Sequence, residues 1–405
     1  MQVITSDGIR FYDIDPSGQT DVSDSLQEIF DNLYSIGITA LTLQFLPGIY
    51  YINKPLTLKF ISIAIRGAAH GGVDIHGTNL ASGTIFQLGK DCFPSCLTFF
   101  CASAPHSFPA GQSPWPYKTT RISVANINFV GYNNTDVDTQ NGYSRFKDNE
   151  PNFRRFCWYP AADRYTDIEL EGQRAITISQ AKASEKPEML SIDSCYFTDL
   201  YVGLDIANCD VSNIRHSWFG QMVYGIRYHG AGQCIMMNDN CFADLETAIQ
   251  LNKACMSTLH NNTFAYISKC FILKNSSEIN INSNVVRNWH QATGTATCGA
   301  FLSAQQCKNL TVSSNTVLNA LDSRTKTRTV DSEPNGRAFV DFDNCSNTIF
   351  IGNLLDTAQT EPVVKLTMCT NFTSYSNMIL YGAGGMAYTI ADKCQNIKLT
   401  DQQLN

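Results

Sequence analysis

Residues 248–264 read AIQLNKACMSTLHNNTF, and residues 271–286 repeat the same pattern as FILKNSSEININSNVV. Each segment has an apolar pair around one outward residue, a polar corner, a second apolar strand, and a corner that ends in an apolar residue. Six further segments between residues 203 and 404 follow this pattern. Short alternating strands with polar corners, at a period of roughly 22 to 25 residues, are typical of coils that bury their inner faces on one another. The sequence therefore predicts an all-β fold, a single-stranded right-handed parallel β-helix.

Two residue types recur at the corners of these coils. Alignment on the closing apolar residue places one asparagine two positions before it, at Asn240, Asn262, Asn284, Asn315, Asn353 and Asn377. Asparagine tolerates a tight left-handed corner, and its amide can bond the equivalent corner of the next coil, so we expect a ladder. A looser column of cysteines near the other corner is interpreted as stacked interior thiols rather than a redox or metal site. It contains Cys209, Cys234, Cys255, Cys307, Cys345, Cys369 and Cys394.

The pattern predicts one domain over residues 1–405, because a repeat fold grows by adding coils and needs no second core. Residues 1–45 form the expected N-terminal cap region, in which DVSDSLQEIFDNLYSIG (21–37) has apolar residues at helical spacing after Asp and Ser capping candidates. Two stretches interrupt the coils. We expect an aromatic and arginine-rich insertion at 131–172 and a polar loop at 321–336.

Composition and charge exclude several classes of partner. The chain is 43% hydrophobic and 16% charged, with a net charge of -7, which argues against nucleic acid and against an acidic membrane surface. No apolar run is long enough to span a membrane. The start, MQVITSDGIRFYDID, lacks the regions of a secretory signal, so we expect a cytoplasmic protein, or one assembled on a virion if it is a tailspike. No metal-ligand motif is present in the sequence, and we expect no cofactor.

Several short segments together resemble a known family. FLPGIYYI (45–52) resembles the entry segment of the pectin-lyase-like β-helices, which bind and cleave polysaccharides. The order of FYDID (11–15), IAIRGAAHGG (63–72), TNLASGTIFQL (78–88), RISVANINFVG (121–131) and YGIRYHGAGQ (224–233) resembles inulin fructotransferase and difructose-anhydride hydrolase, glycoside hydrolase family 91. The resemblance runs nearly end to end and implies a fructan-acting enzyme that assembles as a homotrimer.

This family resemblance also implies a catalytic Asp and, eleven residues later, a catalytic Glu just before a segment like HGAGQ. Carried over from the match at 230–233, these positions hold His216 and Arg227, so both expected carboxylates are replaced. One coil further on, Asp239 recovers the Asp, but Gln250 stands at the Glu position.

The outward columns give candidate residues without the family. One column holds Ser194, His216, Asp239, Asn261 and Ser283, and another holds Asp205, Arg227, Gln250 and Ile272. Column neighbours in stacked strands lie about 5 Å apart, so we expect His216 beside Asp239 and Asp205 beside Arg227. Glycosidic cleavage needs a proton donor and a carboxylate, which makes Asp239, Asp205 and His216 the catalytic candidates, presented to solvent. The plainer interpretation is a solvated Asp and an ordinary surface ion pair.

Substrate binding is assigned to polar and aromatic side chains around these columns, because aromatic rings stack on sugar faces. They are Arg227, Gln250, Trp158, Tyr159, Arg154, Arg155 and Trp289. The insertion aromatics can equally serve packing or a subunit contact.

Three functions stay open. The first is a carbohydrate-active enzyme that cleaves glycosidic bonds, most like inulin fructotransferase. The second is a non-catalytic glycan-binding β-helix, such as a phage tailspike module. The third is a uronate lyase or epimerase, which needs a cation to neutralise the carboxylate and a group to move the α-proton, as Arg227, Tyr228 and His229 offer.

Overall fold

The computed structural model describes residues 1–68, 83–100, 121–131, 173–179, 187–289, 300–320, 339–356, 362–380, 385–391 and 393–404. These residues form one helix, α1 (Ser23–Ser35), and the strands β1 to β34. They fall into two compact units, one up to Phe219 and one from Gly220 onward, and each is considered by itself. The insertions expected at 131–172 and 321–336 lie outside the described residues, apart from Gly131. The single-domain organisation stays a prediction.

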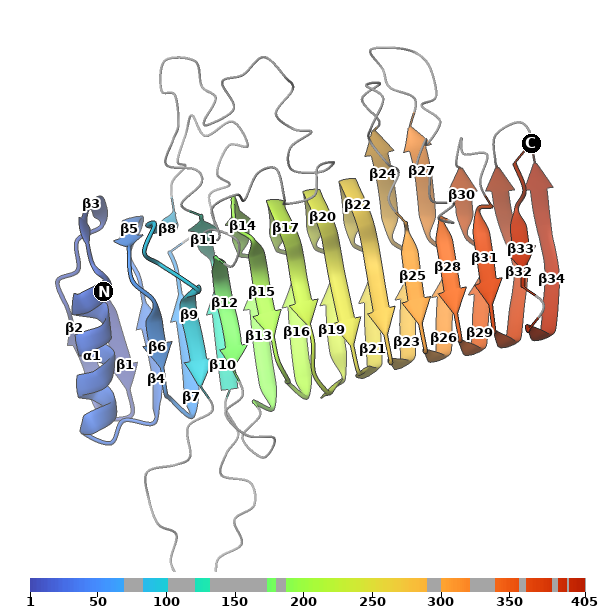
Figure 1. Cartoon of the computed structure of the whole chain (residues 1–405). Helices are drawn as coiled ribbons and strands as arrows, with labels where there is room; N and C mark the ends of the chain where they lie inside the picture. Colours follow the sequence, from blue (N-terminus) through green and yellow to red (C-terminus); the bar gives the residue numbers. More distant parts are fainter. Residues whose placement is uncertain are drawn as a thin grey trace, which may run out of the picture. The chain divides into compact units, whose positions relative to one another are not determined.

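Three stacks of parallel strands make up the first unit (Figure 1). The first stack contains β4 (Ala40–Gln44), β7 (Ser62–Arg66), β10 (Arg121–Ala125), β13 (Met189–Asp193) and β16 (Val211–Arg215). The second contains β3 (Ser17–Asp21), β5 (Gly48–Ile52), β8 (Thr84–Leu88), β11 (Ile127–Val130) and β14 (Tyr196–Thr198). The third contains β6 (Leu56–Leu58), β9 (Ser95–Phe100), β12 (Arg174–Ser179) and β15 (Val202–Ile206). Consecutive strands of one coil thus belong to different stacks, as a parallel β-helix requires.

The N-terminal residues cover the first coil as predicted. The hairpin of β1 (Gln2–Thr5) and β2 (Gly8–Phe11) pairs antiparallel with β4 through β1. Helix α1 buries Leu26, Phe30 and Leu33, and its Gln27 exchanges hydrogen bonds with the backbone of Thr57 in β6. The helix lacks the expected Asp or Ser cap, because Val22 occupies the N-cap position without a side-chain hydrogen bond. Among the described residues no helix is long and apolar enough to span a membrane.

The second unit continues the same plan. Its first stack contains β19 (Ile235–Asn238), β21 (Ala254–His260), β23 (Ser277–Asn282), β26 (Lys308–Ser313), β29 (Ser346–Ile351), β32 (Thr370–Leu380) and β34 (Gln395–Leu404). Its second contains β20 (Cys241–Asn252), β22 (Thr263–Lys274), β24 (Val285–Trp289), β27 (Thr316–Ala320), β30 (Leu354–Asp356) and again β32. Its third runs from the end of β22 through β25 (Leu302–Gln305), β28 (Val340–Asp343), β31 (Val364–Thr367) and β33 (Tyr388–Ile390). The short β18 (Gly232–Gln233) pairs with β21, and β17 (Trp218–Tyr228) contains the boundary between the units.

Aromatic side chains fill the inside of the coils. In the first unit Phe86, Phe129, Phe197 and Phe219 contact one another in succession with centroid separations of 4.7 to 5.5 Å. Each sits at the same place in its coil, so burial of one ring on the next couples neighbouring coils. The predicted β-helix is therefore confirmed, with its core along the inner face of each stack.

The asparagine column forms the predicted ladder in the second unit. The Asn262 side chain is buried, and its Oδ1 accepts the backbone N–H and Nδ2 of Asn240 at 3.1 Å each. Asn262 donates in the same way to Asn284, and the pattern continues through Asn315, Asn353 and Asn377. The ladder ends on a carboxylate, because Asn377 donates its N–H and Nδ2 to Asp401 Oδ1 at 3.0 and 2.9 Å.

The left-handed corner does not fall on the ladder asparagines, as we expected, but on the residue before each of them. Positive φ angles of 54 to 63° occur at Asp239, Asn261, Ser283, Ser314, Gly352 and Ser376, and His216, which precedes Ser217, has a φ of 50°. The ladder amide must point inward to reach the next coil, so the sharp turn precedes it. This corner position favours Asn, Asp, His, Ser or Gly for reasons of backbone conformation alone.

The cysteine column is confirmed in part. Cys209, Cys307, Cys345 and Cys369 are buried free thiols. Cys234 is exposed, and Cys255 and Cys394 are half-buried. The strand register places Cys255 in one column with Ser277 and Lys308, outside the buried column. Ser276 occupies the buried corner there instead, where its hydroxyl accepts the Ala254 N–H at 3.2 Å.

Candidate functional site

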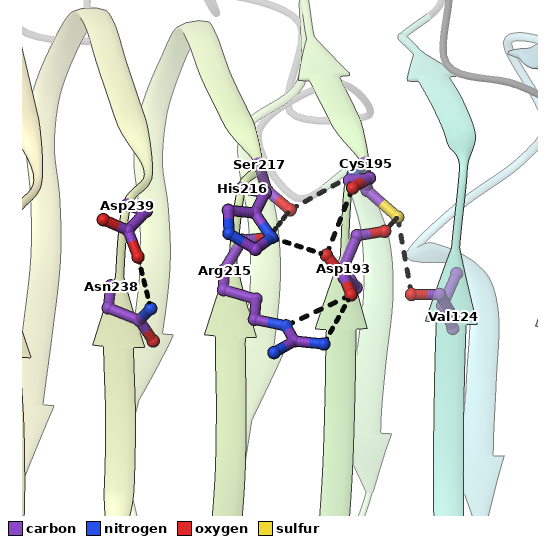
Figure 2. Close-up of polar contacts among 9 residues, drawn as sticks. Val124, Asp193, Cys195, Arg215, His216, Ser217, Asn238 and Asp239 are labelled. Atoms are coloured by element: carbon purple, nitrogen blue, oxygen red, sulfur yellow. Dashed lines mark hydrogen bonds and ion pairs between the residues drawn. The ribbon is translucent and has the colours of Figure 1, made fainter.

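A charged cluster lies where β13 and β16 end (Figure 2). The two strands pair so that Asp193 stands opposite Arg215. The Arg215 guanidinium donates to Asp193 Oδ2 from Nε at 3.1 Å and from Nη2 at 2.9 Å. The other carboxylate oxygen of Asp193 lies 3.0 Å from His216 Nδ1 and accepts the Ser194 hydroxyl at 3.1 Å. One carboxylate therefore holds a guanidinium, an imidazole and a hydroxyl together.

These contacts keep the Asp193 carboxylate ionised. Partial burial raises the pKa of Asp193. The hydrogen bonds from His216, Arg215 and Ser194 and the charge of Arg215 together lower this pKa by more, so it lies below the ordinary Asp value. An ionised carboxylate only accepts hydrogen bonds, so the His216 Nδ1 facing it carries a proton. In the neutral imidazole the remaining Nε2 then has a free lone pair.

The backbone presents His216 outward. The residue adopts a left-handed conformation with φ 50°, and its side chain is 52% exposed. The next residue, Ser217, is buried, and its hydroxyl accepts the Cys195 N–H at 3.1 Å while donating to Arg215 O at 2.8 Å. Ser217 thus occupies the ladder position of its coil and fixes the corner from which His216 projects.

The prediction that Asp205 is presented to solvent is wrong. Its side chain is only 3% exposed, and Oδ2 pairs with Arg174 Nη1 at 3.0 Å. The two residues come from neighbouring strands, with Thr177 of β12 opposite Asp205 of β15. Asp205 does lie between two inward residues, as alternation predicts, but it is buried and paired with Arg174. A covered, paired carboxylate is unsuited to exchange protons with a solvent-borne substrate.

Asp239 is exposed as predicted, but its position has a structural explanation. It occupies the left-handed corner with φ 57°, and its N–H donates to His260 O at 3.3 Å. Its carboxylate accepts Asn238 Nδ2 at 2.6 Å. Because the backbone conformation alone favours Asp at this corner, the presence of an Asp here is weak evidence for catalysis. A catalytic role for Asp239 stays a prediction.

The predicted binding residues are distributed unevenly. Arg227 and Gln250 are half-buried, and the Arg227 guanidinium lies 5.4 Å from the Tyr224 ring centroid. Tyr228 is buried, which removes it from the lyase set considered with Arg227 and His229. Trp289 ends β24, but its side chain lies outside the described residues. Arg154, Arg155, Trp158 and Tyr159 also lie outside them.

Sequence reasoning missed Asp193. It directly precedes Ser194 in the outward column, and it reaches His216 diagonally across one coil. The signal that identifies it is the alternation of β13, which turns Ser191 and Asp193 outward beside Asn213 and Arg215.

The comparisons with known proteins establish the fold but no protein family. The family model NosD, described as a periplasmic copper-binding protein, matches residues 159–328, which is less than half of the chain. Within the described ranges no group of three or more His, Cys, Asp or Glu side chains could hold a metal ion, so these residues do not fit a copper centre. No curated protein sequence matches the chain.

Solved structures match it nearly end to end. The DFA-IIIase of Arthrobacter chlorophenolicus A6 in complex with GF2 has a TM-score of 0.64 at 12% identity, covering 96% of this chain and 93% of that one. The same enzyme without its lid gives 0.62 at 14% identity, covering 95% and 91%. The A-module of the Azotobacter vinelandii mannuronan C-5 epimerase AlgE4 gives 0.51 at 11% identity, covering 97% and 94%. At these identities the likeness is one of fold, and the chain is a right-handed parallel β-helix protein of the pectin-lyase-like kind.

Proposed function

We propose that this protein is a carbohydrate-active enzyme that cleaves glycosidic bonds of a poly- or oligosaccharide. The observation that carries the proposal is the exposed His216 imidazole held by an ionised Asp193 on the outer face of the first strand stack. An imidazole can exchange a proton with a sugar oxygen or carbon near neutral pH. The end-to-end likeness to a DFA-IIIase and to a mannuronan C-5 epimerase supports a carbohydrate substrate.

The finer proposal is a fructan-acting enzyme of the inulin fructotransferase or DFA-IIIase type, working as a homotrimer. The DFA-IIIase likeness supports it. A light-scattering mass equal to the 44.9 kDa of one chain would exclude the trimer.

The alternative is a non-catalytic glycan-binding protein. The burial of Asp205 favours this alternative. A glycosidase uses two solvent-facing carboxylates, and only one of the two predicted here, Asp239, is exposed.

A product screen separates these functions. The wild-type protein is incubated with inulin, DFA-III, polymannuronate and polygalacturonate, and products are separated by anion-exchange chromatography. We expect cleavage of at least one substrate and its loss in His216→Ala, with Arg10→Gln, an exposed arginine in β2, as the control. Binding of a glycan without any product from any substrate would favour the alternative.

A further inference from the structure

The outer face of the second stack carries two columns of side chains in the second unit. Strands β22, β24, β27, β30 and the end of β32 lie side by side there (Figure 1), and each turns two residues outward around a buried one. The first column contains Thr263, Val285, Thr316, Leu354 and Met378. The second contains Ala265, Arg287, Leu318, Asp356 and Leu380. These ten residues are called the stripe.

The stripe is largely apolar, and solvent reaches it. Val285 and Met378 are 45% and 40% exposed, and the three leucines are half-buried. Only two of the ten residues, Arg287 and Asp356, carry a charge. Contiguous apolar side chains on a surface mark an interaction site, whereas scattered ones do not.

The two charges stand at mirror positions in the second column. Arg287 lies one coil before Leu318, and Asp356 lies one coil after it. Neighbouring coils are about 4.8 Å apart, so each charge is about 5 Å from the level of Leu318. A half-turn about the line of β27 therefore exchanges the positive and the negative position. A surface with this order of charges is complementary to itself.

We infer that the stripe binds the same stripe of a second copy of this chain, with the coil axes of the two stripes antiparallel and a twofold axis along β27. In this arrangement Leu318 faces Leu318 of the partner subunit, and Arg287 faces the partner subunit's Asp356. The same two charges meet a second time on the other side of the axis. A twofold interface uses one patch on both subunits, and the order of charges in the stripe meets that condition.

Side-chain size follows the same symmetry. The half-turn places the small Ala265 opposite the partner subunit's Leu380, and Thr263 opposite the partner subunit's Met378. Small residues thus face large ones at both ends of the stripe. Two sheets can then approach to the usual separation of about 10 Å with their strands aligned.

An arrangement with parallel coil axes fits the stripe less well. Symmetry about an axis parallel to the coils brings residues of the same coil to the same height. Arg287 would lie level with Arg287 of the partner subunit, and Asp356 level with Asp356 of the partner subunit. Like charges at equal height repel, so the order of charges favours the antiparallel arrangement.

The size of the stripe sets the expected affinity. Five coils at about 4.8 Å, with three residues per strand at about 3.3 Å each, give a footprint of roughly 250 Å². Stable interfaces bury about 800 Å² per partner, so this contact is small. We therefore expect a dimer that dissociates on dilution, with a dissociation constant in the micromolar range.

The first test measures the mass of the full chain by light scattering and sedimentation from about 1 to 300 µM. The mass should rise from the 44.9 kDa of one chain toward twice that value. Leu318→Asp places two carboxylates face to face at the twofold axis, so it should raise the dissociation constant about a hundredfold. Ile349→Asp is the matched control, because Ile349 is 42% exposed in β29 of the first stack and lies outside the stripe. It should leave the dissociation constant unchanged.

The second test exchanges the charges. Arg287→Glu or Asp356→Arg alone brings like charges together on both sides of the axis and should weaken association about tenfold. The double variant Arg287→Glu/Asp356→Arg restores opposite charges and should return the dissociation constant to within about threefold of the wild-type value. Melting curves of each variant exclude unfolding as the cause.

The outcomes separate this assembly from the homotrimer of the proposed function. A mass of one chain at every concentration overturns the inference. An assembly that Leu318→Asp leaves intact, a trimer included, also overturns it. A dimer that each single charge reversal weakens and the double exchange does not restore overturns the antiparallel arrangement. A mass of six chains that Leu318→Asp divides into trimers supports both the stripe and the homotrimer, whereas a dimer that Leu318→Asp dissociates supports the stripe and excludes the homotrimer.

Discussion

Replacement of Asn284 by alanine tests whether the asparagine ladder holds the coils of the second unit together. The buried side chain takes part in four hydrogen bonds: Oδ1 accepts Asn262 N and Nδ2, and Nδ2 donates to Leu259 O and Asn315 Oδ1. Asn262 Nδ2 keeps its bond to Met237 O, and Asn315 Oδ1 keeps the bond from Asn284 N. The Asn262 N–H, by contrast, loses its acceptor inside the core.

The expected cost follows from this count. A buried donor without a partner costs about 1 to 3 kcal/mol, and each of the three other lost bonds contributes about 1 kcal/mol, so Asn284→Ala should lower the free energy of unfolding by about 5 kcal/mol. Guanidinium denaturation followed by circular dichroism measures it, from the midpoint and the slope together.

Asn282→Ala is the matched control. Asn282 lies two residues earlier and is half-buried, and its side chain makes no hydrogen bond to another described residue. Its replacement should change stability by less than about 0.5 kcal/mol. Equal midpoints for the two variants would refute the view that the amide ladder contributes to stability.

Four further results are expected. Arg174→Met removes the arginine that pairs with the buried Asp205 carboxylate and should cost about 3 kcal/mol in the free energy of unfolding, measured by denaturation. Because the Asp193 pKa is lowered in the folded state, its contribution is present above the ordinary Asp pKa and lost as pH falls through the folded value, so wild type and Asp193→Asn should converge in melting temperature only in acid. Mass spectrometry after alkylation should find exposed Cys234 modified before Cys270, whose thiol pKa is raised by burial. Gly67→Ala should unfold at lower temperature, since the added Cβ would lie 1.9 Å from Asn126 O.

The coil pattern was predictable because every coil needs apolar residues at the same inward positions. The asparagine column was found for the same reason. The left-handed corner was placed one residue too late because asparagine itself favours such a corner, and only the inward direction of the buried amide shows that the residue before it makes the turn.

The candidate site was less predictable. Alternation shows that Asp205 leaves the core face of its strand, but not that it is buried and paired with Arg174 of the preceding coil. His216 was predicted from its column, whereas its partner Asp193 lies diagonally opposite on the neighbouring coil, and that relation depends on the strand register. Alternation in β13 turns Asp193 outward, but its pairing with His216 depends on the strand register, which leaves no periodic signal in the sequence.

The ladder of amides is also a one-way relay. Each asparagine accepts hydrogen bonds from the coil before it and donates hydrogen bonds to the coil after it. Any one of these asparagines could therefore take the place of another in the ladder. A duplicated coil of 22 residues, inserted between Asn262 and Asn284, would find a matching rung on both sides. Asp401 breaks this modularity, because a carboxylate receives from Asn377 and has no N–H to pass on. Its second oxygen instead takes the hydroxyl groups of Ser374 and Tyr388. Adding a coil after Asp401 would require Asp401→Asn first, so that the ladder could continue. Adding a coil before Asp401 would not require this substitution.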